Sequence, residues 1–520
     1  MKPIHFFHAY TPAGPEGALR PVQLTVDDGL IQAVSYDNAP LEGERRIDCG
    51  GQVLLPGFID SHLHLPGSLL YRLHGVELLD CASLEDCQRA LEGHTGGSAA
   101  LRGFGWSQMA IQEDPQALLR FQDFLNQAFP SLPVALFSDD YHSCIVNRAL
   151  LNTVSRQLPQ GYWDKETGLL RERAVFALLH SVPALSFRRE EIEDALLAFQ
   201  ALLLSRGITA VQTLMPIGME EAVCFDALQK LESEGLWKIR VSFSVTAHPA
   251  DSPQTILDRY RAFQARRSPL VRTHTVKLYI DGVLDNRSAF LKAPYQDEDL
   301  QGAPIWEDGA LEAFCTLFDR ENIQLHAHVI GDAAAEQIVR ALEKGMAANG
   351  RSRNENRHTL AHLQLVDGET RRSIGRLGLG CALQPFWFPQ DRVYPIDLAR
   401  LGQRTGEIYP CGELLRLGGR VTFGSDSPVT PDPAPLAGMA CAMGRSVREQ
   451  RLSFSEALRA YTSAGAWQLY QTAGRIAPGC LADFVLVHAP DGLDSPEAVR
   501  SCAVTRTFIG GETAWSAGPR

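Results

Sequence analysis

Short apolar runs and amphipathic stretches alternate through the middle of the chain. From about residue 191 onwards, each run rich in β-branched residues is followed by a stretch whose apolar residues recur at helical spacing. The runs predict strands at 208–214, 239–246, 275–280, 323–329, 359–365, 380–385 and 421–425. The stretches between them predict helices, among them 219–234, 253–266, 309–321 and 332–348. This rhythm predicts repeated β/α units around a parallel sheet.

An earlier apolar run supplies one more strand of the same kind. Val53, Leu54 and Leu55 enter a Pro-Gly turn, and Phe58 and Ile59 continue as a short buried strand. With this strand the count is eight, which closes a ring. We therefore expect an α/β fold with a (β/α)₈ barrel rather than a doubly wound sheet. An all-helical fold agrees poorly with so many short β-branched runs.

Both ends of the chain and one long segment lie outside this rhythm. The ends carry short predicted strands at 22–26, 30–34, 46–49, 482–487 and 504–509. Neither end has enough strands for a core of its own, so we expect residues 1–56 and 474–520 to combine into one small β-sandwich. The barrel then comprises residues 57–65 and 191–473. The segment 66–190 is longer than any ordinary loop between a strand and a helix, and we expect it to form an inserted subdomain over the barrel mouth.

Composition and charge narrow the partners to expect. The chain of 520 residues has a formal net charge of −12 and contains no block of lysine or arginine. This pattern favours neither a nucleic acid nor an anionic membrane, so we expect a small-molecule substrate. No apolar stretch approaches a membrane span and the first residues lack a signal-peptide core, which makes the cytoplasm the expected location. The eleven cysteines show no CxxC pair, as expected for reduced thiols.

Residues able to bind metal ions stand at or near the ends of several predicted strands. His62 and His64 are two positions apart in an extended segment, so their imidazoles share a face. Two surface histidines in a loop are the alternative interpretation. Four more such residues follow or end later strands: Lys277, His328, His362 and Asp426. Because the active site of a (β/α)₈ barrel forms where its strands end, we expect all six side chains to meet at one rim.

Lys277 is unusual because it lies inside an apolar strand. Burial of an unpaired ammonium group costs several kcal/mol, so Lys277 should be paired, deprotonated or chemically modified. A structural salt bridge is the simpler explanation. The alternative is carbamylation by CO₂, which converts the cation into a carboxylate able to bridge two metal ions about 4 Å apart.

Several motifs together resemble one family. They are PGFIDSHLH at 56–64, DYHSCIVN at 140–147, KLYIDGVLDNRSA at 277–289, HVIGDAA at 328–334, RHTLAHLQ at 357–364, GSDSPV at 424–429 and GRIAPGCLADFVL at 474–486. This set resembles the amidohydrolase superfamily of metal-dependent hydrolases. Within it the set is most similar to the amidohydrolase-3 branch, which includes YtcJ-like proteins and N-substituted formamide deformylases.

The resemblance implies a centre of two divalent cations, with zinc as the expected metal. It implies six ligands: His62, His64 and Asp426 for one ion, His328 and His362 for the other, and Lys277, carbamylated, as the bridge. His326 shares a strand face with His328 and is the rival ligand. The Ile-Gly-Asp after His328 matches the family pattern and favours His328.

The resemblance also implies residues that contact the substrate. His142 lies in a stretch similar to the family's Asp-Gly-His-Ser, and we expect it to project from the insertion towards the substrate. A histidine that only satisfies the turns of the insertion is the alternative. Arg287, after the fourth barrel strand, is a second candidate, for which a solvated loop arginine is the alternative. Tyr141 and Ala361 depart from the family pattern, in which glycine and glutamate are usual.

These residues predict a hydrolase that cleaves a carbon–nitrogen bond, in an N-acyl or N-formyl amide. A metal-activated hydroxide would attack the carbonyl carbon, with Asp426 as general acid and base. One alternative is a deaminase with a single metal ion, acting on a cyclic amidine or nucleobase, in which Lys277 is an ordinary lysine. Another is a binding or regulatory protein on the same fold. Because the family tends to dimerise, a homodimer is the expected assembly.

Overall fold

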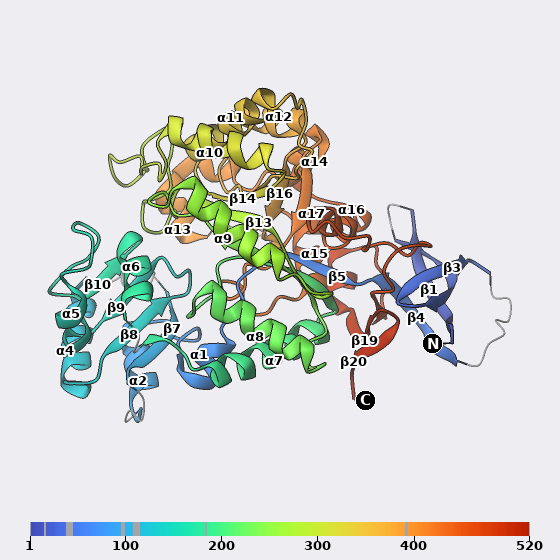
Figure 1. The fold of residues 1–520 in the computed structure, drawn as a ribbon, viewed down its shortest axis with the longest axis horizontal. Coiled ribbons are helices and arrows are strands. Elements are labelled where there is room, and N and C mark those ends of the chain that lie inside the picture. Colours follow the sequence, from blue (N-terminus) through green and yellow to red (C-terminus); the bar gives the residue numbers. More distant parts are fainter. Residues whose placement is uncertain are drawn as a thin grey trace.

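The computed structural model describes residues 2–14, 17–37, 45–94, 99–107, 115–182, 185–389 and 394–518. Its strands form three sheets, which lie in three parts of the molecule (Figure 1). The barrel occupies the middle, the sheet made from both termini lies at one end, and the sheet of the inserted segment lies at the other. Among the described residues, no helix is both long enough and apolar enough to cross a bilayer.

The predicted (β/α)₈ barrel is confirmed. Eight parallel strands follow one another around the sheet in the order β17-β16-β15-β14-β13-β12-β11-β5. Their bounds are β5 (Phe58–Leu63), β11 (Ile208–Thr213), β12 (Arg240–Thr246), β13 (Val271–Tyr279), β14 (Gln324–Val329), β15 (Thr359–His362), β16 (Gly380–Leu383) and β17 (Arg420–Phe423). Nearly every residue of these strands is buried, because helices cover the outer face and side chains fill the interior.

The helices between these strands pack their apolar sides on the barrel. The main ones are α7 (Arg189–Ser205), α8 (Glu221–Ser233), α9 (Pro253–Ala265), α10 (Asp308–Arg320), α11 (Asp332–Ala348), α12 (Gly368–Leu377), α13 (Pro395–Leu401), α14 (Cys411–Leu417), α15 (Pro435–Met443), α16 (Phe454–Ala460) and α17 (Ser463–Gln468). Four of them match the predicted helices to within two residues at each end. The hydrophobic periodicity was therefore sufficient to find them.

The chain ends form a single seven-stranded sheet. Its strands, in spatial order, are β20 (Glu512–Ser516), β19 (Ala503–Ile509), β18 (Phe484–His488), β4 (Arg45–Pro56), β1 (Ile4–Ala13), β2 (Ala18–Asp27) and β3 (Leu30–Ser35). The sheet curls, because Ile31 exchanges backbone hydrogen bonds with the segment that leads into β18. Phe6 packs edge-on against Phe484 and Phe508 in the enclosed core. The two ends of the chain therefore share one core, with β1 and β20 added to the strands that the sequence predicted.

The inserted segment has a sheet and a core of its own. Its five strands are β6 (Val76–Glu77), β7 (Leu101–Trp106), β8 (Val134–Ser138), β9 (Ser143–Val146) and β10 (Leu169–Arg171). The helices α1 (Leu69–His74), α2 (Leu84–Leu91), α4 (Pro115–Ala128), α5 (Arg148–Val154) and α6 (Arg173–Ser181) belong to the same segment. Trp106, Phe121 and Leu136 are buried in this core. The segment leaves the barrel after β5 and returns to it through α7.

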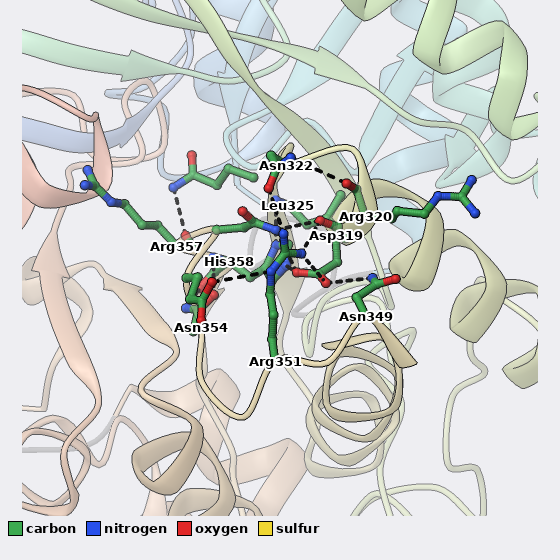
Figure 2. Close-up of polar contacts among 12 residues, drawn as sticks. Asp319, Arg320, Asn322, Leu325, Asn349, Arg351, Asn354, Arg357 and His358 are labelled. Carbon is green, nitrogen blue, oxygen red and sulfur yellow. Dashed lines mark hydrogen bonds and ion pairs between the residues drawn. The ribbon is translucent and has the colours of Figure 1, made fainter. Parts of the chain in front are cut away.

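A buried ionic network joins two loops at the N-terminal ends of β14 and β15, the end of the barrel opposite to the predicted site (Figure 2). Asp319, 1% exposed, accepts hydrogen bonds from Arg351 at 2.7 Å, Asn349 at 2.8 Å and His358 at 3.1 Å. The other ring nitrogen of His358 accepts the backbone N–H of Leu325 at 3.1 Å. Burial alone would raise the pKa of Asp319, but these hydrogen bonds hold it well below its usual range.

Replacement of Asp319 by alanine is expected to lower the free energy of unfolding by about 3 to 5 kcal/mol, because several buried donors lose their acceptor. The pKa of Asp319 is lower in the folded protein than in the unfolded chain, so the ionised carboxylate stabilises the wild type at pH values above the unfolded-state pKa. This stabilisation is lost as the pH falls towards the folded-state pKa. The difference between the two proteins should therefore shrink below about pH 4. Urea unfolding at several pH values measures it, with exposed Asp299→Ala as control. An equal loss in both variants would contradict the role of the network.

Candidate active site

A cavity of about 300 Å³ lies at the C-terminal ends of the barrel strands. Six side chains predicted at strand ends line it: His62 on β5, His64 just after it, Lys277 on β13, His328 on β14, His362 at the end of β15 and Asp426 after β17. They come from five strands that are distant along the chain, because parallel strands bring their carboxyl ends to one rim. The cavity is thus the place where the ligand-type residues meet.

Hydrogen bonds to oxygen atoms fix the tautomer of three of these histidines. Nδ1 of His64 lies 2.7 Å from the carbonyl oxygen of Met215, and Nε2 of His328 lies 3.1 Å from that of Gly282. Because a carbonyl oxygen only accepts, each of these nitrogens carries the hydrogen. Nδ1 of His362 is held in the same way by Oε1 of Gln384 at 2.9 Å. The second nitrogen of each neutral ring keeps a lone pair, as in metal-binding histidines.

His62 and His326 form a pair behind the cavity wall. Nδ1 of His62 lies 3.0 Å from Nε2 of His326, and His326 does not line the cavity. When His62 donates in this pair, its Nε2 keeps a lone pair. That Nε2 is buried and makes no hydrogen bond within the described part of the chain. The geometry thus places His328 at the cavity and His326 in contact with His62.

The donor atoms around Asp426 converge on one point. Oδ1 of Asp426 lies 3.0 Å from Nε2 of His62 and 3.1 Å from Nε2 of His64. A lone pair on His64 facing a carboxylate oxygen at this distance is repulsive unless a cation lies between them. Donor atoms of His62, His362 and Asp426 also lie within 4.8 Å of one another. This set of imidazole and carboxylate donors fits a divalent transition-metal ion.

Electrostatics keep most of these donors in the form that binds metal. Burial lowers the pKa of His62 and His328 well below the ordinary value, and that of His362 to about 4. Burial alone would raise the pKa of Asp426, but the nearby imidazoles of His62 and His64 outweigh it and hold this pKa well below its ordinary value. Neutral imidazoles and an ionised carboxylate are the states that metal ligands require.

Lys277 reaches the same cavity with no anion against it. Its side chain is 1% exposed, its Nζ lies 4.8 Å from the ring centroid of Tyr279, and no carboxylate in the described chain forms an ion pair with it. Burial lowers the pKa of Lys277 to about 7, so near neutral pH much of the amine is uncharged. The structural salt bridge considered from the sequence is therefore absent from the described residues.

The barrel closes where β5 meets β17, and this seam positions two of the candidate ligands. The backbone N–H of Asp426 donates to the carbonyl of His62 at 2.7 Å. Below this bond, the buried carboxylate of Asp60 accepts the N–H groups of Ser425 and His62, all at 3.1 Å. The backbones approach so closely that a Cβ at Gly424 would lie 2.6 Å from the His62 nitrogen. The seam thus depends on a carboxylate and a glycine.

Backbone strain is concentrated at the same rim. His362 has a φ of +69°, the next residue, Leu363, +47°, and Asp426 +56°. A left-handed backbone conformation is uncommon for residues other than glycine, although aspartate adopts it more often than most. The strain ends β15 at His362, whereas the sequence predicted a strand to residue 365. Strained residues of this kind persist where the surrounding structure holds them in place.

The insertion contributes one imidazole to the cavity. His142 lines it with its ring centroid 5.7 Å from that of His328, and its Nδ1 lies 2.8 Å from Oε2 of Glu172. Glu172 also accepts hydrogen bonds from Ser288 at 2.6 Å and Asn286 at 3.2 Å. Burial would lower the pKa of His142, but the charge of Glu172 outweighs it and raises that pKa to about 9. Glu172 has no sequence signal of its own.

Arg287 lies outside the cavity lining. Its guanidinium pairs with Asp297 at 2.9 Å and with Glu298 at 3.0 Å, and a third of the side chain is exposed. The cavity instead contains acidic residues that the sequence analysis missed: Asp139, Asp285 and Asp397. Asp285 belongs to the loop after β13, so a search of all strand-end loops would find it. Asp139 and Asp397 come from the insertion and from helix α13, where no spacing rule applies.

Comparison with known proteins relates the chain to hydrolases. The amidohydrolase family model matches residues 45–514. Putative amidohydrolase YtcJ of Bacillus subtilis is 28% identical over 94% of both chains, and N-substituted formamide deformylase of Arthrobacter pascens is 23% identical over 89% of both. A solved structure, an uncharacterized metal-dependent hydrolase from Pyrococcus horikoshii, has a TM-score of 0.72 and 22% identity and covers 93% of this chain and 97% of its own.

Replacement of Asp60 by alanine is expected to lower the free energy of unfolding by about 2 kcal/mol, because two buried N–H groups lose their acceptor. Chemical denaturation in the presence of a chelator measures this effect without any contribution from a bound metal. Asp60→Asn keeps an acceptor oxygen and should lose less. Unchanged stability of Asp60→Ala would show that this carboxylate does not hold the seam.

Proposed function

Because the chain belongs to the amidohydrolase family, we propose that it hydrolyses the carbon–nitrogen bond of a small N-acyl or N-formyl amide, using two divalent cations at the barrel mouth. The observation that carries the proposal is the set of imidazoles that meet a carboxylate and a buried lysine without an ion pair in the described chain, all at one cavity. Similarity to a formamide deformylase supports the choice of bond. A cavity of about 300 Å³ suits a small molecule.

The candidate ligands would divide into two sets. His62, His64 and Asp426 would hold one ion, His328 and His362 the other, and zinc is the metal that we expect. Divalent cations held in this way lower the pKa of water and polarise a carbonyl oxygen. The bonds to Met215, Gly282 and Gln384 orient the imidazoles, which sets the direction of their lone pairs before any ion binds.

Lys277 would join the two sets as a carbamate. The uncharged amine that burial favours is the nucleophile needed: its nitrogen bonds to the carbon of CO₂ and loses a proton, which leaves a carboxylate on the side chain. This reaction converts a buried amine without a counter-ion into an anion among metal ligands. The unpaired state of Lys277 therefore supports carbamylation over the structural salt bridge.

Asp426 would transfer a proton during the reaction, and His142 would hold a proton that it donates in a hydrogen bond to the substrate. Asp426 is ionised and lies at the centre of the donor set, where its carboxylate accepts a proton from the attacking water and passes it to the departing nitrogen. His142 is oriented by Glu172, so its Nε2 is directed away from that carboxylate and available to donate a hydrogen bond to the substrate.

Metal content tests the two-ion proposal directly. Protein purified without chelator and analysed by elemental mass spectrometry is expected to hold about two ions per chain. Lys277→Ala should hold about one ion, because it lacks the bridge, and Lys277→Glu should regain the second, because it supplies a carboxylate. One ion per wild-type chain would contradict the proposal and favour the deaminase with a single metal ion.

Asp426→Asn is expected to lower turnover of an N-formyl amide by about a hundredfold or more, since proton transfer loses its base. Metal content measured on the same sample separates loss of proton transfer from loss of an ion. Asp332→Asn, at the start of α11 and outside the cavity lining, provides a control with the same chemical change. Wild-type turnover in Asp426→Asn would exclude Asp426 from the mechanism.

Glu172→Gln tests the positioning of His142. Glutamine keeps the shape of the side chain but removes the charge that orients and protonates the imidazole, so kcat/KM should fall by about tenfold to a hundredfold. The metal content should stay at the wild-type value, because Glu172 is not among the proposed ligands. His142→Ala combined with Glu172→Gln should be no worse than His142→Ala alone. Additive losses would show that Glu172 acts independently of His142.

A further inference from the structure

Besides the proposed ligands, acidic residues line the cavity. Asp139 follows β8 of the insertion, Asp285 lies in the loop after β13, and Asp397 belongs to α13. Three distant parts of the chain thus each place a carboxylate on the same cavity. Asp140 also lines it, but this residue is already used, since it accepts the hydroxyl of Ser138 and the backbone N–H of His142.

These three carboxylates have no ionic partner. In the part of the chain that the structure describes, no lysine, arginine or histidine forms an ion pair with any of them. Asp397 is 4% exposed and accepts one hydrogen bond, from Gln364 at 2.8 Å. Arg400, one turn further along α13, pairs with Asp297 and donates to the backbone carbonyl of Asp285, not to its carboxylate. The charges of Arg400 and His142 lower the pKa of Asp285 without outweighing its burial, and neither cation forms an ion pair with its carboxylate.

The cost of this arrangement is visible in the pKa values. Burial is the largest cause that raises the pKa of all three carboxyl groups, and repulsion from neighbouring carboxylates is the second. The pKa of Asp139 lies well above its ordinary value, that of Asp285 is about 6 and that of Asp397 is about 7. A buried anion without a partner is unfavourable. A cation bound in the cavity would remove both the repulsion and the desolvation cost.

The spacing of the carboxylates argues for an organic cation and against a metal ion. In the described part of the chain, Asp139, Asp285 and Asp397 belong to no group of three donor atoms within 4.8 Å of one another, which favours a larger organic cation that reaches several of them. The cavity lining contains no arginine; its cationic groups are Lys277, among the proposed metal ligands, and His142, which pairs with Glu172. The rings of Trp387 and Tyr409 lie in the same lining, and aromatic faces bind ammonium and guanidinium groups.

We propose that the substrate carries an ammonium or guanidinium group, which Asp139, Asp285 and Asp397 bind while the amide lies at the proposed metal ligands. This inference rests on the proposed function of the cavity and names the class of substrate. A monoacylated diamine is the simplest compound with both groups. Neutral and anionic amides would leave the carboxylates unpaired or repelled, so the cavity selects against them.

Binding of a matched pair of compounds tests the proposal without turnover. N-(5-aminopentyl)methanesulfonamide and N-hexylmethanesulfonamide have chains of equal length, differ by an ammonium group and are not amides. Titration calorimetry of the metal-loaded protein is expected to show the cationic compound binding at least about tenfold more tightly. Equal affinities, or no saturable binding of the cationic compound, would overturn the proposal.

Single substitutions then locate the preference. Asp397→Asn keeps the oxygen that accepts from Gln364, and both it and Asp285→Asn should reduce the preference to about threefold or less. Glu298→Gln, an exposed residue outside the lining, removes the same charge and should keep the full preference. An unchanged preference in both asparagine variants would also overturn the proposal. Hydrolysis of the corresponding formamides is a separate measurement: its absence would contradict the proposed reaction, while a retained binding preference would still support a cationic ligand.

Discussion

The hydrogen bonds across the barrel seam are the constraint on which the site depends. Strands β5 and β17 are the first and last of the barrel, and the carboxylate of Asp60 and the bond between Asp426 and His62 hold them together. The same contacts set the distance between the imidazole of His62 and the carboxylate of Asp426. Closure of the fold and assembly of the donor set are therefore one event, and a barrel that opened at this seam would lose both.

Around this seam, each candidate imidazole ligand is held by a hydrogen bond to a neighbouring group. Carbonyl oxygens hold His64 and His328, an amide holds His362, and a second imidazole holds His62. The insertion repeats the pattern, with Glu172 behind His142. Strained backbone at His362 and Asp426 persists because the buried surroundings leave no room to relax. Hydrogen bonds within the fold thus orient the donors.

Much of the barrel and of the donor set could be predicted from the sequence, because both follow from periodicity and strand ends. The helix at 332–348 and the strand that carries Lys277 are examples. Strand β1 was missed, since His5 and His8 interrupt its apolar pattern. Glu172 and Asp397 were missed for another reason: a loop and a short helix bring them to the cavity, and only the folded chain shows where those segments end.

The terminal sheet carries a consequence for biosynthesis. Strand β4 pairs with β1 on one side and with β18 on the other, and β18 is made only after the whole barrel. During translation one edge of β4, with the buried Leu54 and Leu55, has no partner, which is the condition in which strands aggregate. The nascent chain thus needs protection of β4 until the ribosome releases the last segment. Either a chaperone binds this strand, or the barrel folds quickly enough to keep the strand apart from other chains.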